Sequence, residues 1–172
     1  MKNKSILMAM LLGGMISLQA CKNDDDLISI DKETFMAEAT SGNILEIQTG
    51  SLAVQQAEKP AVKAYAGHMI MDHSMVMVKL DSVSKAQNIT LSMQLNGNHQ
   101  QQLNSLIPLN GNAFDKAYAS LMVQSHQNQV NLFEQAAEGV NDLSLRGFAA
   151  KSLPTLRTHL QEAIALNATV NP

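Results

Sequence analysis

Four residues whose side chains can bind a metal ion stand at matching places in four predicted helices. They are Glu46, His73, His126 and His159. Imidazole and carboxylate groups are suitable ligands for zinc, iron, manganese and copper. Each of the four lies in a stripe of apolar or small residues that repeats at alternating four- and three-residue steps, which is the pattern that a helical bundle buries. The spacing therefore predicts chemistry in the core of the protein.

Four long helical segments position these residues. They cover residues 31–58, 60–88, 112–138 and 142–167, and a shorter helical piece covers 99–107. Asp31 suits the N-cap of the first helix, and Pro60 suits the first position of the second. Pro154 lies inside the fourth helix, where we expect a kink or a break. Because strand patterns are nearly absent, we predict an all-α fold, an antiparallel four-helix bundle with a short extra helix between helices 2 and 3.

The metal-capable residues fall near the middle of their helices. Glu46, His73 and His126 lie close to the helix midpoints, and His159 lies a few residues past its own. In an up-and-down bundle, helices of similar length place their midpoints in one layer. We therefore expect the four side chains to converge at the bundle centre. Asp72 and Glu162 neighbour the buried histidines from other helix faces, which assigns them a supporting role.

A core that contains these groups has two interpretations. An isolated ionised carboxylate is very costly to bury, so it must be paired, hydrogen-bonded or coordinated. A network of protonated histidine and glutamate meets that need without metal, and a single transition-metal ion meets it equally well. Met69 and Met77 flank His73 at four-residue steps, a set that suits Cu(I), although methionine more often fills space in a core. If the histidines are neutral when folded, stability should fall upon acidification, because unfolding then takes up protons.

The N-terminus has the pattern of a secretion signal over residues 1–20. A positively charged start precedes an apolar run that is too short to span a membrane comfortably. The four residues that end at Cys21 resemble the bacterial lipoprotein signal, in which the cysteine receives a diacylglycerol and a fatty acid. Residues 21–30 are then a lipidated acidic tether to a domain at 31–168. We expect an outer-membrane lipoprotein of the bacterial envelope that faces the periplasm or the cell surface.

The composition excludes several classes of function. The 172-residue chain has a formal net charge of −3 and no basic cluster, so no nucleic-acid partner is expected. Aromatic residues are only 3% of the chain, too few for a base-stacking platform. The single cysteine is assigned to the lipid anchor, and neither a nucleophile elbow nor a phosphate-binding glycine pattern is present. The expected partner is the membrane, through the anchor. A protein partner, the oligomeric state and any enzymatic activity stay open.

Motifs spread over the chain give a family resemblance. They are Phe35…Ala39…Gly42…Glu46, Ala66-Gly67-His68-Met69-Ile70-Met71-Asp72-His73, Phe114-Asp115…Tyr118…His126 and Leu153-Pro154…His159. Together they resemble the ferritin-like domain family of unknown function often labelled "predicted outer membrane protein" in bacteria. The resemblance covers roughly residues 30–166. It implies a ferritin-like four-helix bundle in the cell envelope, without an established activity.

The sequence departs from the ferritin ligand pattern. Di-iron sites of this type use a Glu from each of two helices and a Glu-x-x-His pair on each of the other two. Ile70, Val123 and Leu156 stand three residues before the histidines, so only Glu46 matches by role. A mononuclear His/Glu site is therefore the predicted alternative to a ferroxidase centre. Two functional hypotheses follow: a membrane-anchored envelope lipoprotein whose His/Glu layer is structural, or a transition-metal-binding protein in metal handling or oxidative-stress protection.

Overall fold

The computed structural model describes residues 30–172, which form five helices and no strand. The helices are α1 (Lys32–Gln56), α2 (Pro60–Gln87), α3 (Gly97–Leu106), α4 (Gly111–Gly139) and α5 (Leu143–Val170). For this part of the chain the all-α prediction is confirmed. The predicted signal, the predicted lipidation site Cys21 and nearly all of the predicted tether lie outside the described residues. Within residues 30–172, no helix has the length and apolarity that a membrane crossing requires.

Local signals in the sequence explain where the helices begin. The Asp31 side chain accepts a hydrogen bond from the Thr34 backbone N–H at 2.8 Å and caps α1, as predicted. The Asp142 side chain caps α5 in the same way. Helix α5 is continuous from Leu143 to Val170, so the chain does not break at Pro154, and the kink that was the other expectation stays a prediction. Proline removes one backbone donor from the helix, and the burial of neighbouring apolar residues of α5 against the core compensates for that loss.

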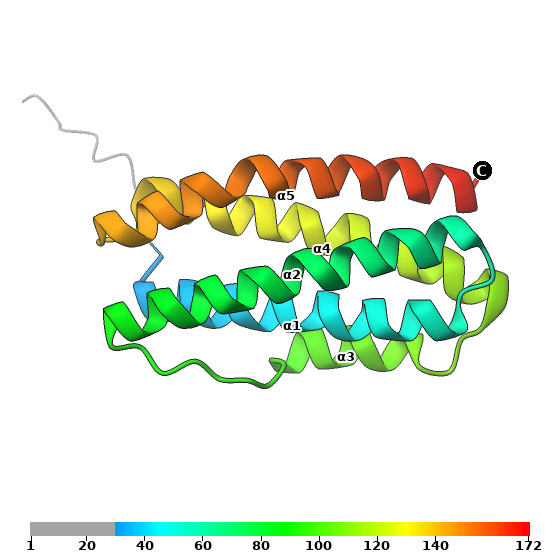
Figure 1. Ribbon diagram of the computed structural model, residues 1–172, viewed down its shortest axis with the longest axis horizontal. Coiled ribbons are helices and arrows are strands. Elements are labelled where there is room, and N and C mark those ends of the chain that lie inside the picture. The colour runs from blue at the N-terminus through cyan, green and yellow to red at the C-terminus, as the bar shows by residue number, and fades with distance from the viewer. Residues whose placement is uncertain (1–29) are drawn as a thin grey trace, which may run out of the picture.

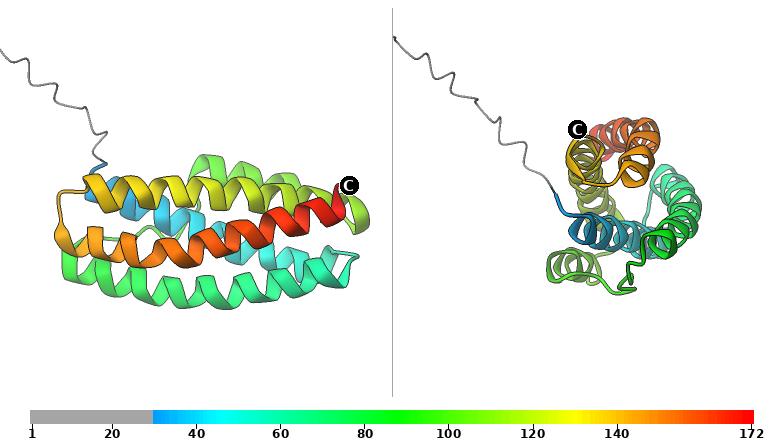
Figure 2. Two further views of the ribbon diagram at one scale, coloured as in Figure 1. Left: turned by 90° about the horizontal axis from the view of Figure 1, so that it is seen from above. Right: turned by 90° about the vertical axis from the view of Figure 1, so that its left-hand side faces the viewer.

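The four long helices lie side by side, and α3 lies against the outside of α1 (Figure 1). Helices α1 and α2 form one antiparallel pair, and α4 and α5 form a second (Figures 1 and 2). The two pairs are joined mainly where α1 packs on α4, whereas α2 and α5 share few close contacts. The seam between α2 and α5 is therefore the open side of the bundle.

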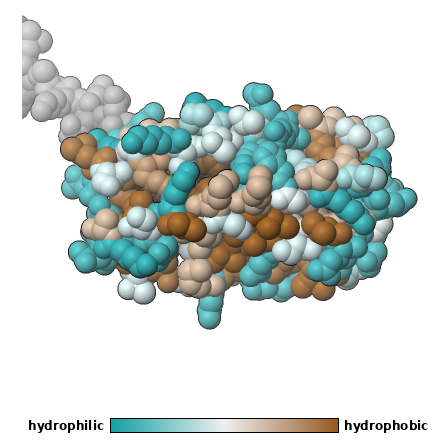
Figure 3. Space-filling view, viewed as in Figure 1, coloured by the Kyte–Doolittle hydropathy of each residue, from teal (hydrophilic) through white to brown (hydrophobic). Residues whose placement is uncertain are grey.

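The outer face of α2 carries several apolar side chains. Met71, Met75 and Val78 are all more than half exposed. Figure 3 shows this side of the molecule as a mixture of hydrophobic and hydrophilic residues. Scattered apolar residues of this kind are ordinary for a protein surface.

The apolar core is divided into two clusters along the bundle. One contains Met69, Phe114, Tyr118 and Met122, together with residues near the C-terminal ends of α1 and α5. The other lies towards the opposite end of the bundle. It includes Phe35, Leu80, Phe133, Leu145 and Leu156. On α2, α4 and α5, a buried histidine stands between the residues of one cluster and those of the other. The buried polar layer thus occupies the boundary between the two apolar clusters.

Candidate metal centre

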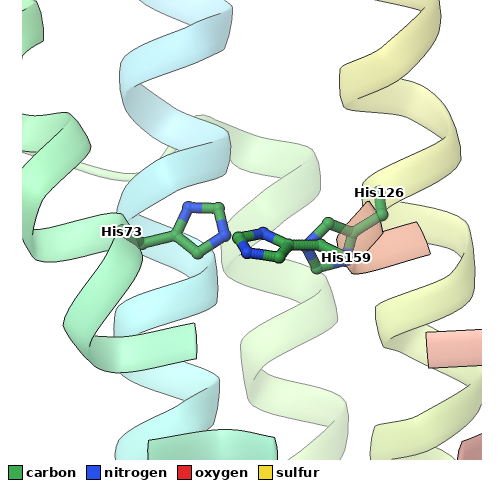
Figure 4. Close-up of side chains that lie close together, drawn as sticks. All are labelled: His73, His126 and His159. Carbon is green, nitrogen blue, oxygen red and sulfur yellow. The ribbon is translucent and has the colours of Figure 1, made fainter. Parts of the chain in front are cut away.

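Three histidines from three helices meet at this boundary. His73 of α2, His126 of α4 and His159 of α5 each offer a ring nitrogen, and these atoms lie within 4.8 Å of one another (Figure 4). The ring centroids are 5.4–5.7 Å apart, and each residue is at most 3% exposed. The helical register predicted this convergence. It follows from similar helix lengths and from the positions of the histidines in the buried stripe.

Two of the rings are oriented by hydrogen bonds at Nδ1. His73 Nδ1 donates to Asn43 Oδ1 at 2.7 Å, and the Asn43 amide donates back to the His73 carbonyl oxygen, also at 2.7 Å. His126 Nδ1 donates to the Met122 carbonyl oxygen at 2.9 Å. A carbonyl oxygen only accepts, so the proton of each neutral ring is on Nδ1 and the lone pair is on Nε2.

The third ring is oriented from the opposite side. His159 Nε2 donates to Asp72 Oδ2 at 3.0 Å, which leaves the lone pair on Nδ1. Among the described residues, His73 Nε2, His126 Nε2 and His159 Nδ1 have no hydrogen-bond partner although all three are buried. Metal-binding histidines characteristically donate their other N–H to a carbonyl or carboxylate in this manner. The arrangement therefore presents three oriented lone pairs to one buried space.

The protonation of the rings is consistent with this arrangement. Burial lowers the pKa of His73 well below its ordinary value, and the neighbouring histidines act in the same direction. Burial also lowers the pKa of His159, while its hydrogen bond to Asp72 opposes that effect. Both rings are neutral at pH 7, which is the state that binds a metal ion.

Glu46 lies in the same layer but behind the histidines. Its Oε1 is 3.7 Å from His126 Nδ1, the nitrogen that bonds to the Met122 carbonyl oxygen, so it does not face the three lone pairs. The carboxyl group is completely buried, and neither oxygen has a partner within the described part of the chain. Burial raises the pKa of Glu46, and His126 opposes that shift. In place of the expected four-residue cluster, three histidines face one another, and Glu46 lies on the Nδ1 side of the His126 ring.

Two buried tyrosines near Glu46 were not expected from the sequence. The hydroxyl groups of Tyr65 and Tyr118 also lack partners among residues 30–172, and the two rings meet edge to face at 6.3 Å. Burial raises the pKa of both hydroxyls, and the charge of Glu46 adds to that effect. Tyr65 and Tyr118 directly precede Ala66 and Ala119, which belong to the buried stripes of α2 and α4. This position beside the stripe was the sequence signal that could have indicated their burial.

The two supporting acids have different surroundings. Asp72 contacts His159, as a supporting residue should. Glu162 contacts no histidine of the central three. Its Oε2 lies 3.5 Å from His68 Nδ1 instead. His68 Nε2 also lies 3.2 Å from Asp72 Oδ2, so His68 contacts carboxylates of two different helices.

Comparison with known proteins places the chain in a family. The pattern of the domain of unknown function DUF4142 matches residues 18–166. The chain belongs to the DUF4142 family. A solved structure of CopM in its Cu(II)-bound form has a similar fold, with a TM-score of 0.68 and 14% sequence identity over 82% of this chain and 98% of that one. No curated protein matches the chain. The family has no assigned function, and the likeness to CopM shows the fold alone.

A cavity in this DUF4142 domain reaches two of the central histidines from the open seam. It has a volume of about 390 Å³, and its wall includes His73, His159 and Asn43. Lys79 and Lys151, both exposed, also line it. An ion held by three imidazoles needs a fourth ligand to complete a tetrahedron, and a water molecule or small anion in this cavity would supply one.

Proposed function

We propose that this protein binds one transition-metal ion through His73 Nε2, His126 Nε2 and His159 Nδ1. The observation that carries the proposal is that these three buried nitrogens have no partner among the described residues, while the opposite nitrogen of every ring is hydrogen-bonded. Three imidazole nitrogens with a fourth position open to a cavity are a ligand set for Cu(II) or Zn(II).

We favour copper as the first ion to test. Cu(II) binds nitrogen ligands more tightly than the other divalent first-row ions do. The similar fold of CopM, whose solved structure contains Cu(II), supports this choice. Redox turnover is not part of the proposal. Three histidine ligands and a fourth ligand from the cavity would complete a binding site, and metal handling is the role that such a site supports.

The cellular setting is a separate part of the proposal. We infer that the domain is a ferritin-like bundle held at the bacterial outer membrane by a lipidated Cys21, after removal of residues 1–20. The support is the lipoprotein-like pattern around Cys21 and the acidic stretch that follows it. Mass spectrometry of the protein purified from its host membrane tests this. An N-terminal acylated cysteine is expected, and an unmodified cysteine or an intact N-terminus would contradict it.

The test of metal binding is a competition titration of the metal-free protein with Cu(II) and Zn(II) against chelators of known affinity. One ion should be retained at the central histidines, and His73→Ala should weaken its binding by more than about 100-fold, beyond the effect of a supporting residue. His99→Ala is the matched control, because His99 bonds to Ser41 and lies outside the cluster. Equal affinity of the His73 and His99 variants would refute the proposed site.

A structural role is the second candidate, and one observation favours it. Glu46 and His126 are both fully buried and lie 3.7 Å apart, as a pair that fixes helix register would. Under this hypothesis the protein is an envelope lipoprotein whose polar layer specifies the packing of the bundle. Neither metal would then be retained, and substitutions at His73 would change only the free energy of unfolding.

A further inference from the structure

A second group of metal-capable side chains lies in the seam between α2 and α5 and shares His159 with the central three. His68 Nε2 is 3.2 Å from Asp72 Oδ2, and the same oxygen is 3.0 Å from His159 Nε2. One ligand atom from each of His68, Asp72 and His159 lies within 4.8 Å of the others. The group therefore offers two imidazoles and a carboxylate to one position.

His68 lies between two carboxylates. Glu162 Oε2 lies 3.5 Å from His68 Nδ1, and Asp72 Oδ2 lies 3.2 Å from His68 Nε2. With a proton on Nδ1, which faces Glu162, the lone pair on Nε2 is available to an ion that Asp72 also binds. The sequence assigned Glu162 to the central histidines, and in the structure it supports His68 instead.

His159 belongs to both groups. Its Nδ1 is one of the three unpaired nitrogens of the central site, and its Nε2 contacts Asp72 in the seam. The two nitrogens of one imidazole point in nearly opposite directions from the ring. His159 is thus placed between a buried site and a site that solvent reaches, because the His68 side chain is 41% exposed and that of Asp72 is 19% exposed.

We propose that the protein has a second metal site formed by His68 Nε2, Asp72 Oδ2 and His159 Nε2, and that His159 bridges the two ions. The bridge rests on the proposed central site. When the second ion binds, the proton on His159 Nε2 is released to solvent and the ring becomes an imidazolate, with one nitrogen on each ion. The second ion belongs to the divalent transition-metal class that accepts mixed imidazole and carboxylate ligands, such as Cu(II) or Zn(II).

The two sites have different access to solvent, which gives them different exchange behaviour. The central histidines are at most 3% exposed, whereas a surface hollow lined by His68, Glu162 and Tyr65 opens beside the second site. The second ion should therefore leave quickly when a chelator is added, and the central ion should leave slowly. A protein with this arrangement would take up an ion at the seam before retaining one in the core.

The test is equilibrium dialysis of the metal-free mature protein with Cu(II), combined with electron paramagnetic resonance of the loaded samples. We expect two bound ions and a loss of signal in the doubly loaded protein, because an imidazolate couples the two Cu(II) spins. His68→Gln should bind one ion with full signal intensity, since His68 is half exposed and its replacement leaves the core intact. His99→Gln, outside both groups, should behave as the wild type does.

The outcomes separate this inference from the proposed function. One ion in the wild type that is lost in His126→Gln and kept in His68→Gln would overturn the second site and leave the central site standing. Two ions with undiminished signal would overturn the bridge. One ion that is lost in His68→Gln and kept in His126→Gln would overturn the central site and the bridge together. Far-UV circular dichroism of each variant checks that the helices are retained.

Discussion

The histidine layer should make the metal-free protein sensitive to acid, and His73 provides the clearest measure. Burial lowers its pKa well below the ordinary value of 6.5. The unfolded chain therefore binds a proton at His73 below pH 6.5, while the folded protein does not. The contribution of His73 to the free energy of unfolding is fully present above the pKa of the unfolded state. It is lost as the pH falls towards the lower pKa of the folded state.

The size of the effect follows from the unfolded pKa alone. For a ring that stays neutral in the folded state, a change from about pH 7 to about pH 5.5 lowers the free energy of unfolding by about 1.3 kcal/mol. His73→Gln removes this contribution and retains an amide beside Asn43. His159, whose pKa is also lowered, is present in both proteins, so its contribution largely cancels in the comparison. The wild type should lose about 1.3 kcal/mol more than the variant does.

The assay is urea unfolding, followed by far-UV circular dichroism, of chelator-treated protein at both pH values. Helix content is the appropriate signal, because the chain has no tryptophan. Parallel losses in the wild type and in His73→Gln would show that the folded protein protonates His73, and would refute the assignment of a neutral ring.

Three further predictions concern the surroundings of the site. Asn43→Leu removes the hydrogen bond that orients His73, so Cu(II) affinity in the competition titration should fall about 10–100-fold, and unchanged affinity would contradict the role of the amide. Burial raises the pKa of Glu46 above its ordinary value of 4.5, so the wild type loses stability as the pH rises through the folded-state pKa, and Glu46→Gln does not. In urea unfolding, the free energy of unfolding of Glu46→Gln should therefore rise relative to that of the wild type between about pH 5 and pH 8. A difference between the two proteins that stays constant over this range would count against the raised pKa. Gly42→Ala places a Cβ against the side-chain amide of Gln129, which must then move, whereas Gly67→Ala meets nothing within 4 Å and should add up to about 1 kcal/mol. Gly42→Ala should therefore melt at a lower temperature than Gly67→Ala, and similar melting temperatures would refute the packing argument.

The helices could be predicted from the sequence because their signals are local. Asp31 and Pro60 mark helix starts through the backbone chemistry of a single turn, and both lie where they were expected. Pro154 does not break α5, because the cost of one missing hydrogen bond is local, whereas the packing that holds α5 together is not. Long helices of similar length also determine which residues share a layer, so the convergence of His73, His126 and His159 could be predicted from their positions along the chain.

The sequence did not determine the direction in which each side chain points within that layer. Glu46 is at the expected height but faces the far side of His126, because a helix rotation of one residue moves a side chain by about 100°. The contact between His68 and Glu162 depends on which faces of α2 and α5 are turned towards each other, and the hydrophobic periodicity of the sequence does not specify this. Tyr65 and Tyr118 were missed for the same reason, since each stands beside the predicted stripe and is nevertheless buried.

The direction of the N–H groups is the strongest argument against a purely structural layer. A self-sufficient polar network places donors opposite acceptors, so each ring should donate to its neighbour. Here the N–H groups of His73, His126 and His159 all point outwards to Asn43, a backbone carbonyl and Asp72, and three acceptors face one another. A buried acceptor that is left without a partner costs about 1–3 kcal/mol, and the rings in these orientations give one another no donor. A single cation between them would bind all three lone pairs.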